Sequence, residues 1–469
     1  MSVRAGFIGV DRHRDPSVRD LTGARRDAAA LWALVSDSLE DVDATLLADE
    51  DATLENVRDL LKSTLGAASE DDVVILGFAG HGTPDHRLVL HDSQFASLPS
   101  TTLDMDELAQ AFRASRARVV LCFLDCCFSG GASARVLSGA PATRDALSSI
   151  AAVAGRGRIL FAASGLAEEA IEDPDSRHGL FTKSILDCLF EATGEVGVLD
   201  LVTQVSARVT DGAARMGYVQ TPSFFGELEA SLSLPPGKRG ARFAEVFPEL
   251  VRGPVSGAFS ELGAYGLPAI VLEAWQARFP GGLNSLQLSA VNDHGVLDGR
   301  SILTVAPTSA GKTFVGEMAA LQAISDGRKA VFLLPFKALV NEKFADFSEL
   351  YGDQLGLRIA RCSGDWQDQV LQVLQGKYDI AFFTYEKFLS LSVAAPHLLR
   401  QIGLVVLDEA QFITEPGRGM SVELLLTSLV SARARGVSPQ LIALSAVIGD
   451  TNGFETWLDG HRLFHLKEV

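Results

Sequence analysis

Apolar runs alternate with helical patterns through the first half of the chain. Runs rich in apolar residues predict strands at residues 4–11, 43–48, 72–78, 118–124 and 158–163. Apolar residues at helical spacing predict helices over residues 20–39, 53–65 and 105–114. Strands that are apolar along their whole length belong to sheets buried on both faces, with the intervening helices as cover. The first half therefore predicts an α/β/α sandwich with a mostly parallel sheet.

The second half restarts the same alternation. Strands are predicted at residues 301–305, 330–334, 380–383, 404–407 and 440–444, with helices over 312–324 and 338–350. Between the halves, residues 234–242 contain prolines, glycines and three basic residues, and they lack apolar periodicity. We therefore expect a first domain at 1–233, a linker at 234–261 and a second α/β domain at 262–469.

The composition favours a cytoplasmic protein without a membrane segment. A net charge of −18 gives the chain no global attraction to nucleic acid, so any such contact needs a local basic track. No apolar run is long enough to span a bilayer, and the N-terminus lacks the pattern of a secretory signal. The cysteines number five, an odd count, and three of them lie between Cys122 and Cys127. This usage favours a reducing compartment over a disulfide scaffold.

Two of the predicted strands end in residues suited to peptide-bond cleavage. One leads into Gly80-His81-Gly82 and the other into Asp125-Cys126-Cys127. Chemistry in parallel sheets lies beyond the carboxyl ends of the strands, where a thiolate can attack a peptide while an imidazole moves the proton. A cysteine on a turn also offers its own N–H to the oxyanion, and Gly82 offers a second. We assign the other cysteines, Cys122, Cys188 and Cys362, to the inert core.

At these motifs the chain resembles the caspase-like clan of cysteine peptidases, in particular metacaspases and bacterial caspase-like proteins. The resemblance covers about 4–232 and includes the interval between His81 and Cys127, which is close to the interval of about 50 residues in caspases. It implies that Cys127 is the nucleophile and His81 its partner, and that the substrate is a protein. It also implies that Asp27 and Asp125 line the pocket for the residue before the cleaved bond, which favours Arg or Lys. As in some metacaspases, Ca²⁺ is allowed as a further cofactor.

A phosphate-binding loop opens the first helix of the second half. Ala-Pro-Thr-Ser-Ala-Gly-Lys-Thr at 306–313 follows a strand, so that backbone N–H groups cradle phosphates. The predicted ATP-binding residues are Thr308, Ser309, Ala310, Gly311, Lys312 and Thr313. In this pattern, Lys312 reaches the β- and γ-phosphates and Thr313 holds Mg²⁺. Asp408-Glu409-Ala410-Gln411 follows a later strand, and there Asp408 binds Mg²⁺ and Glu409 orients the attacking water.

The order of these motifs over about 262–469 resembles superfamily 2 helicases, in the superkiller and archaeal repair-helicase branch. The resemblance implies a RecA-like domain that uses ATP and Mg²⁺, with Gln287 reading adenine and Gln411 taking part in ATP hydrolysis. It also implies that residues 335–343 and Arg418-Gly419 face DNA or RNA. A helicase needs a second RecA-like domain, and the sequence ends at Val469 without one. We expect either that the chain is a fragment or that another chain supplies the second domain.

These observations predict a cytoplasmic cysteine endopeptidase that cleaves after basic residues. We expect the attached helicase module to control it, plausibly in antiviral defence. One alternative is a nucleic-acid-dependent ATPase or helicase whose caspase-like domain only docks partners. Another is a self-processing protein that cuts at Arg135, at Arg144 or at Lys238-Arg239 in the linker.

Overall fold

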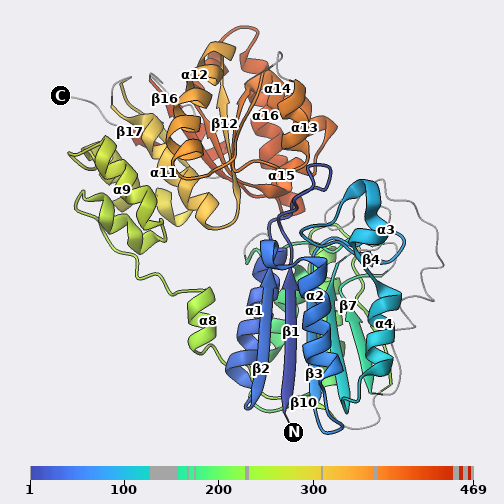
Figure 1. Ribbon diagram of the computed structural model, residues 1–469. Coiled ribbons are helices and arrows are strands. Elements are labelled where there is room, and N and C mark those ends of the chain that lie inside the picture. Colours follow the sequence, from blue (N-terminus) through green and yellow to red (C-terminus); the bar gives the residue numbers. More distant parts are fainter. Residues whose placement is uncertain are drawn as a thin grey trace. The chain divides into compact units, whose positions relative to one another are not determined.

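The chain folds into two compact units, Met1–Glu249 and Leu250–Val469 (Figure 1). The computed structural model describes residues 2–126, 157–165, 168–173, 176–227, 232–307, 310–363, 367–446, 454–457 and 463–465. The boundary between the units falls inside the segment 234–261 that the sequence predicts as a linker. Within these described ranges, no helix is long and apolar enough to cross a membrane.

The first unit is built around one twisted sheet. Its described strands are β1 (Val3–Gly9), β2 (Val42–Ala48), β3 (Val73–Ala79), β6 (Val119–Asp125), β7 (Arg158–Ala162) and β9 (Ser223–Phe225). They pair in the order β2-β1-β3-β6-β7-β9, and every pair is parallel except β7 with β9. Two short antiparallel pairs join β4 (Arg87–Leu88) to β5 (Leu103–Asp104) and β8 (Val196–Gly197) to β10 (Ser233–Leu234).

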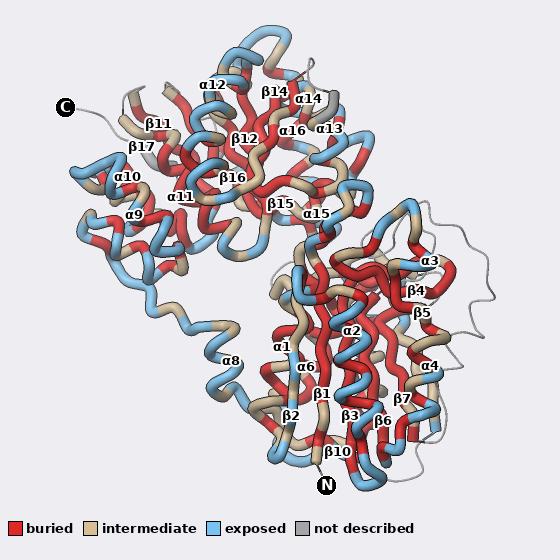
Figure 2. Tube along the Cα trace, viewed as in Figure 1, coloured by how far each residue is buried: buried red, intermediate tan, exposed pale blue. Residues whose placement is uncertain are grey.

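Helices cover both faces of this sheet. The described helices of this unit are α1 (Ala24–Ser38), α2 (Leu54–Leu61), α3 (Leu98–Thr101), α4 (Met105–Ala114), α6 (Leu180–Phe190), α7 (Val198–Arg215) and α8 (Ala241–Val246). One core packs the sheet against α1, α6 and α7 around Phe161 and Phe181, and the other packs it against α2 and α4 around Leu60 and Phe112. Because both faces are covered, β3 and β6 are buried at every position (Figure 2).

The start of α1 differs from the sequence-based prediction. The predicted helix begins at residue 20, whereas α1 begins at Ala24. The carboxylate of Asp11 accepts hydrogen bonds from the N–H groups of Ala24 (2.8 Å) and Arg25 (3.2 Å), so it satisfies donors that the first helical turn leaves open. Residues 10–23 therefore form a loop at the carboxyl end of β1. This loop is important for the site described below.

The second unit holds a larger sheet in which every described pair is parallel. Its strands are β11 (Ile302–Val305), β12 (Lys329–Leu334), β13 (Ile359–Cys362), β14 (Ile380–Thr384), β15 (Ile402–Leu407), β16 (Gln440–Ser445) and β17 (Leu463–His465). They pair in the order β13-β14-β12-β15-β16-β11-β17. The α/β class with parallel sheets is thus confirmed for both units.

The helices of the second unit again pack on two sides of the sheet, in two separate cores. They are α9 (Ala269–Arg278), α10 (Ser285–Asn292), α11 (Lys312–Ser325), α12 (Lys337–Phe347), α13 (Gln367–Leu374), α14 (Tyr385–Ala394), α15 (Leu398–Gln401), α16 (Gly419–Ala432) and α17 (Phe454–Trp457). The predicted helix at 338–350 ends at Phe347 and continues as a π-helical turn, η6 (Ser348–Asp353). The edge strand β13 was not predicted, because its four residues include the polar Arg361.

Candidate functional site

Two neighbouring strand ends carry the histidine and lead to the cysteine of the predicted dyad. β3 and β6 pair with Ala79 opposite Asp125, and the N–H of Gly80 donates to the carbonyl of Asp125 (3.3 Å). His81 follows β3, and the buried Cys126 follows β6. Cys127 is the next residue and lies outside the described ones. The sheet therefore brings His81 and the chain that leads to Cys127 to the same edge.

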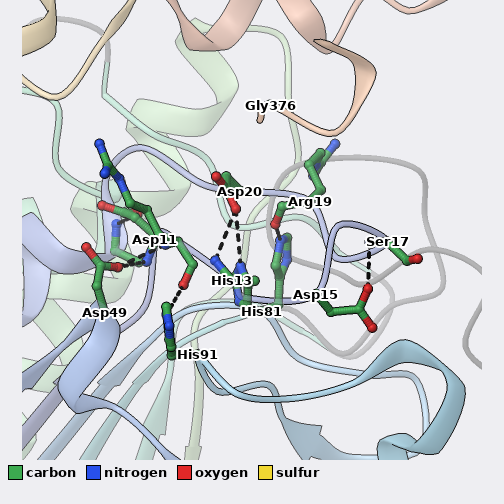
Figure 3. Close-up of polar contacts among 12 residues, drawn as sticks. Asp11, His13, Asp15, Ser17, Arg19, Asp20, Asp49, His81, His91 and Gly376 are labelled. Atoms are coloured by element: carbon green, nitrogen blue, oxygen red, sulfur yellow. Dashed lines mark hydrogen bonds and ion pairs between the residues drawn. The ribbon is translucent and has the colours of Figure 1, made fainter. Parts of the chain in front are cut away.

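The side chain of His81 is fully buried, and the loop 10–23 orients it. Its Nε2 lies 2.8 Å from the carbonyl oxygen of Arg19 (Figure 3). Because a carbonyl only accepts hydrogen bonds, Nε2 carries the proton in this contact. In the neutral ring Nδ1 then has no proton, as the predicted role of His81 as a base for a thiol requires. This contact gives His81 the tautomer of a general base.

The loop that provides Arg19 is itself held at its first residues. The carboxylate of Asp49 accepts the N–H groups of Asp11 (2.8 Å) and Arg12 (2.9 Å). The carbonyl of Arg12 is 2.8 Å from Nδ1 of His91 (Figure 3). These bonds fix the path of the loop, so the Arg19 carbonyl is presented to His81 by a constrained backbone rather than by a free one.

A second buried imidazole lies against His81. The ring centroids of His13 and His81 are 5.4 Å apart and the rings are tilted by 36°. Oδ1 of Asp20 is 3.8 Å from Nδ1 of His13 and accepts the His13 backbone N–H at 3.1 Å. Both His13 and Asp20 are buried. Neither residue was selected from the sequence: His13 lies between the strand predicted at 4–11 and the helix predicted at 20–39, and Asp20 is the first residue of that predicted helix.

The two predicted pocket acids are bonded to the start of the same helix, α6. Oδ1 of Asp27 lies 2.8 Å from Nδ1 of His178, and both of its oxygens accept the N–H of Gly179 (3.1 Å each). Oδ2 of Asp125 accepts the hydroxyl of Thr182 at 2.7 Å. Both carboxylates are buried. In this structure the acids therefore have internal partners, and their role in binding a basic side chain stays a prediction.

Gly82 and the three cysteines assigned to the core are all buried. Gly82 is buried and forms an antiparallel bridge with Leu88, while its role as an oxyanion donor stays a prediction. Cys122, Cys188 and Cys362 are buried, as expected. Burial raises the pKa of the Cys122 and Cys362 thiols to about 12 and also raises the pKa of Cys188, so these thiols stay protonated near neutral pH.

In the second unit, Lys312 opens α11 behind a glycine with φ of 79°, a left-handed conformation. Its Nζ donates to the carbonyls of Ala306 (2.6 Å) and Pro307 (2.7 Å), so the ammonium group rests on the loop itself. Burial lowers the pKa of Lys312, while the acids Glu409 and Asp408 act in the opposite direction. Of the other predicted loop residues, Ala310 and Thr313 are half-buried, and Thr308 and Ser309 lie outside the described residues.

The predicted adenine-reading residue, Gln287, is tied to the phosphate loop through the start of α10. Asn284 and Gln287 form reciprocal side-chain to backbone bonds of 2.9 and 3.0 Å, a capping box. Nδ2 of Asn284 donates to the carbonyl of Ala310 (3.1 Å), and Nε2 of Gln287 donates to that of Gly311 (3.4 Å). Asn284 was not selected from the sequence, although an Asn three residues before a Gln is the pattern of such a cap.

The predicted hydrolysis residues cluster after β15. Glu409 has a φ of 57°, and its Oε2 accepts a hydrogen bond from Nε2 of Gln411. Oε1 of Gln411 accepts the hydroxyl of Ser445 at 2.8 Å, which links this cluster to the end of β16. Burial, and next the charge of Glu409, raise the pKa of Asp408 to about 6. The structure thus joins Glu409, Gln411 and Ser445 in one chain of hydrogen bonds.

The donors near the phosphate loop fit Mg²⁺. The predicted ligands, Thr313 and Asp408, offer a hydroxyl and a carboxylate, and Mg²⁺ prefers oxygen ligands from few protein groups together with phosphates and water. In the part of the chain that the structure describes, no group of three or more His, Cys, Asp or Glu side chains is placed to hold a metal ion. The predicted Ca²⁺ therefore gains no support from the described residues.

Some site residues are invisible to sequence reasoning. Arg19 acts through its backbone carbonyl, which every residue type has, so its identity carries no signal. His13 and Asp20 are separated from His81 by two strands and two helices, and only the fold brings them together.

The comparisons with known proteins agree with this division. The family model of the caspase domain matches residues 4–232, and that of the DEAD/DEAH box helicase matches residues 284–453. The helicase part is similar to the ATP-dependent DNA helicase Hel308 of Thermococcus kodakarensis, with 39% identity over 35% of this chain and 14% of that protein. The same helicase of Pyrococcus abyssi is 38% identical over 35% of this chain and 22% of its own length. This chain thus spans less than a quarter of either relative.

Among solved structures, the DUF1998 helicase MrfA is similar to this chain with a TM-score of 0.38 and 23% identity, over 43% of this chain and 33% of that one. The resemblance seen in the sequence motifs is confirmed by the two family models. The chain therefore contains a caspase-like domain at residues 4–232 and a DEAD/DEAH box helicase domain at residues 284–453.

Proposed function

We propose that the chain is a cysteine endopeptidase that cleaves after Arg or Lys and that its helicase domain controls it through ATP and nucleic acid. The contact of His81 Nε2 with the Arg19 carbonyl carries the proposal, because it sets the tautomer that a base for Cys127 needs.

In the proposed reaction, Nδ1 of His81 takes the proton of the Cys127 thiol, and the thiolate attacks the scissile carbonyl carbon. The carbonyl π electrons move to the oxygen, which the N–H groups of Gly82 and Cys127 stabilise. The C–N bond then breaks, and His81 gives its proton to the leaving amine. A water molecule, deprotonated by His81, hydrolyses the thioester and restores the thiol.

Asp27 and Asp125 would supply the preference for basic residues. Two buried carboxylates near one pocket favour a cationic side chain and disfavour an acidic one, because a buried charge needs an opposite partner. In this structure, His178 and Thr182 occupy part of their hydrogen-bonding capacity. Binding of Arg or Lys would therefore replace or add to these contacts.

In the helicase domain, the predicted site would bind ATP with Mg²⁺. Lys312 would leave the carbonyls of Ala306 and Pro307 for the phosphates, and Thr313 and Asp408 would hold Mg²⁺, which screens phosphate charge. Glu409, held by Gln411, would orient the attacking water. A DNA or RNA strand would lie on the motifs at 335–343 and Arg418. A peptidase joined to a nucleic-acid-binding domain would suit a response to foreign nucleic acid, as in antiviral defence.

One alternative, self-processing in the linker, is weakened by the contacts of Lys238 and Arg239. The N–H of Lys238 donates to Ser38 Oγ (2.9 Å), and the Arg239 guanidinium lies 4.6 Å from the ring centroid of Phe190. A peptidase needs its substrate extended and accessible, so these residues would first have to leave the domain. The other candidate positions, Arg135 and Arg144, lie outside the described residues.

The test is cleavage of fluorogenic peptides with Arg, Lys or Asp before the cleaved bond, with and without ATP and nucleic acid. We expect cleavage after Arg or Lys, its loss in Cys127→Ala and in His81→Ala, and its retention in the matched variant Cys126→Ala. Absence of cleavage by the wild-type chain under every condition would refute the peptidase. If Cys127→Ala keeps the biological function while Lys312→Ala abolishes it, the alternative of a nucleic-acid-dependent ATPase with a docking domain is correct.

A further inference from the structure

The segment 237–247, which we call the strap, is docked on the caspase domain rather than free. Its helix α8 packs beside α1 (Figure 1). The carboxylate of Asp37, near the end of α1, accepts the N–H groups of Gly240 (2.9 Å), Arg242 (3.0 Å) and Phe243 (2.8 Å). The half-buried carboxylate of Asp37 thus satisfies three donors at the start of α8, so it acts as an N-cap that another helix supplies.

Side chains of the strap also contact the domain along its length. The guanidinium of Arg239 lies over the ring of Phe190, and the ring of Phe243 meets Phe190 edge-on at 5.2 Å. Arg242 lies 5.5 Å from the ring of Trp32 on α1. A Cβ at Gly237 would come within 2.8 Å of a terminal methyl carbon of Leu34 and 2.9 Å of the Phe190 ring, so a larger residue there would have to displace these side chains. The strap therefore packs closely against the caspase domain, although its composition predicts a free linker.

The end of the strap reaches the pocket acid through one histidine. The ring of Phe247 packs against His178, with centroids 5.8 Å apart and an interplanar angle of 73°. The guanidinium of Arg26 lies 4.6 Å from the same Phe247 ring. Nδ1 of His178 is bonded to the Asp27 carboxylate. A continuous series of contacts therefore runs from Phe247 through His178 to Asp27.

The connection from the strap to the helicase domain is short. Only Pro248 and Glu249 separate Phe247 from the second unit, which begins at Leu250. Three residue steps span at most about 11 Å when fully extended, and proline removes part of that freedom. A displacement of the second unit beyond this reach must therefore move Phe247.

We propose that the strap is the element through which the helicase domain controls the pocket acid of the caspase domain. With the strap docked, Phe247 holds His178 on Asp27, and the carboxylate is engaged. When the helicase domain pulls the strap away, His178 is released and Asp27 can bind a basic side chain. This inference rests on the proposed function for the identity of the ligand, but its contacts lie wholly within the described residues of the first unit.

Amide hydrogen exchange on the full chain tests the docking. Asp37→Ala removes the acceptor of three strap amides, and Phe247→Ala removes the ring on His178. We expect exchange at Gly240, Arg242 and Phe243 to accelerate by about tenfold in Asp37→Ala, since loss of a helix cap has effects of this size. Glu249→Gln, an exposed position just after the strap, is the matched control and should exchange as the wild type. Unchanged protection in Asp37→Ala would overturn the docking.

Binding of an arginine-containing fluorescent peptide tests the control of the pocket. It is measured in the Cys127→Ala background, so it does not depend on cleavage. We expect both Asp37→Ala and Phe247→Ala to bind the peptide about three to ten times more tightly, with Glu249→Gln unchanged. If the strap variants exchange faster but do not bind the peptide more tightly, the strap does not regulate the pocket. If the strap variants tighten binding but the wild type never cleaves, the peptidase proposal fails and the strap proposal stands.

Discussion

The imidazole rings of His13 and His81 lie 5.4 Å apart inside the caspase domain, and the carboxylate of Asp20 lies beside His13. The Arg19 carbonyl accepts a hydrogen bond from Nε2 of His81 in the plane of the ring, and His13 packs against the ring. The two contacts together restrict the orientation of the His81 ring. Catalytic groups act efficiently only when held close to the reactive geometry. His13 is therefore placed as a positioning residue for the proposed base.

His13→Ala should lower kcat for an Arg peptide by about tenfold with little change in KM, because the His81 ring loses its neighbour. The Asp20 carboxylate would then lose its imidazole neighbour, and a carboxylate in the same pocket of side chains favours the protonated form of His81. The acid limb of the kcat profile should therefore move to higher pH. His294→Ala, in the second unit, is the control. A purely structural loss would lower the amount of folded enzyme and leave the pH profile in place.

The bond between Asp125 and Thr182 allows charge and hydrogen bonding to be separated in the predicted pocket. Asp125→Asn removes the charge and keeps an acceptor, and it should lower kcat/KM for Arg peptides by about thirtyfold, or ~2 kcal/mol. Thr182→Val keeps the charge and should cost about fivefold. The ratio of kcat/KM for Arg against Gln peptides is the measurement. Equal losses of that ratio in both variants would exclude a charge role for Asp125.

Strand ends and phosphate motifs were predictable because they are local patterns. The apolar run before His81 and the Gly-Lys-Thr at Lys312 each specify an element and its terminus. Long-range partners were not predictable. His178 is bonded to Asp27, which lies 151 positions away in the sequence, and no local pattern near either residue predicts this contact. The general rule is that sequence periodicity reports burial, whereas a polar partner is set by the packing of distant elements.

The docking of the strap was also not predictable from local sequence patterns. Residues 234–242, which overlap the strap, contain prolines, glycines and basic residues and lack apolar periodicity, so they predict a linker. Docking depends instead on backbone N–H groups and on Asp37, which lies more than 200 positions away from Gly240 in the chain. Lys312 gives a further case. The motif predicts contact with phosphates, and it does not predict that the ammonium group donates to the carbonyls of Ala306 and Pro307.

Glu317 gives the second unit a predictable pH dependence. Its Oε2 accepts the hydroxyl of Tyr351 (2.8 Å), which in turn accepts the indole N–H of Trp275 (2.9 Å). Burial raises the pKa of Glu317 above its ordinary value. The protonated acid is therefore favoured in the folded state. This contribution to stability is complete below the unfolded-state pKa and is lost as the pH rises through the folded-state pKa.

The melting temperature of the second unit should consequently fall as the pH rises above the ordinary pKa of a glutamate, and Glu317→Gln should flatten that dependence. Glutamine keeps an acceptor for Tyr351 and has no charge to bury. Glu349→Gln, exposed in η6, is the matched control. Differential scanning calorimetry of the full chain gives the measurement. A pH slope in Glu317→Gln as steep as in the wild type would assign the dependence to another group.

Ser445 and Gln411 provide a test of how the predicted water-orienting residue is held. The Ser445 hydroxyl donates to Oε1 of Gln411, which leaves Nε2 of the same amide to face Glu409. Without the hydroxyl the amide can rotate and Glu409 loses a fixed donor. Ser445→Ala should therefore slow ATP hydrolysis about fivefold, or ~1 kcal/mol, with unchanged ATP affinity, because Lys312 and Gln287 are untouched. Ser428→Ala, which removes an exposed hydroxyl on α16, should leave both quantities unchanged. A change in ATP affinity rather than in turnover would place Ser445 in nucleotide binding instead.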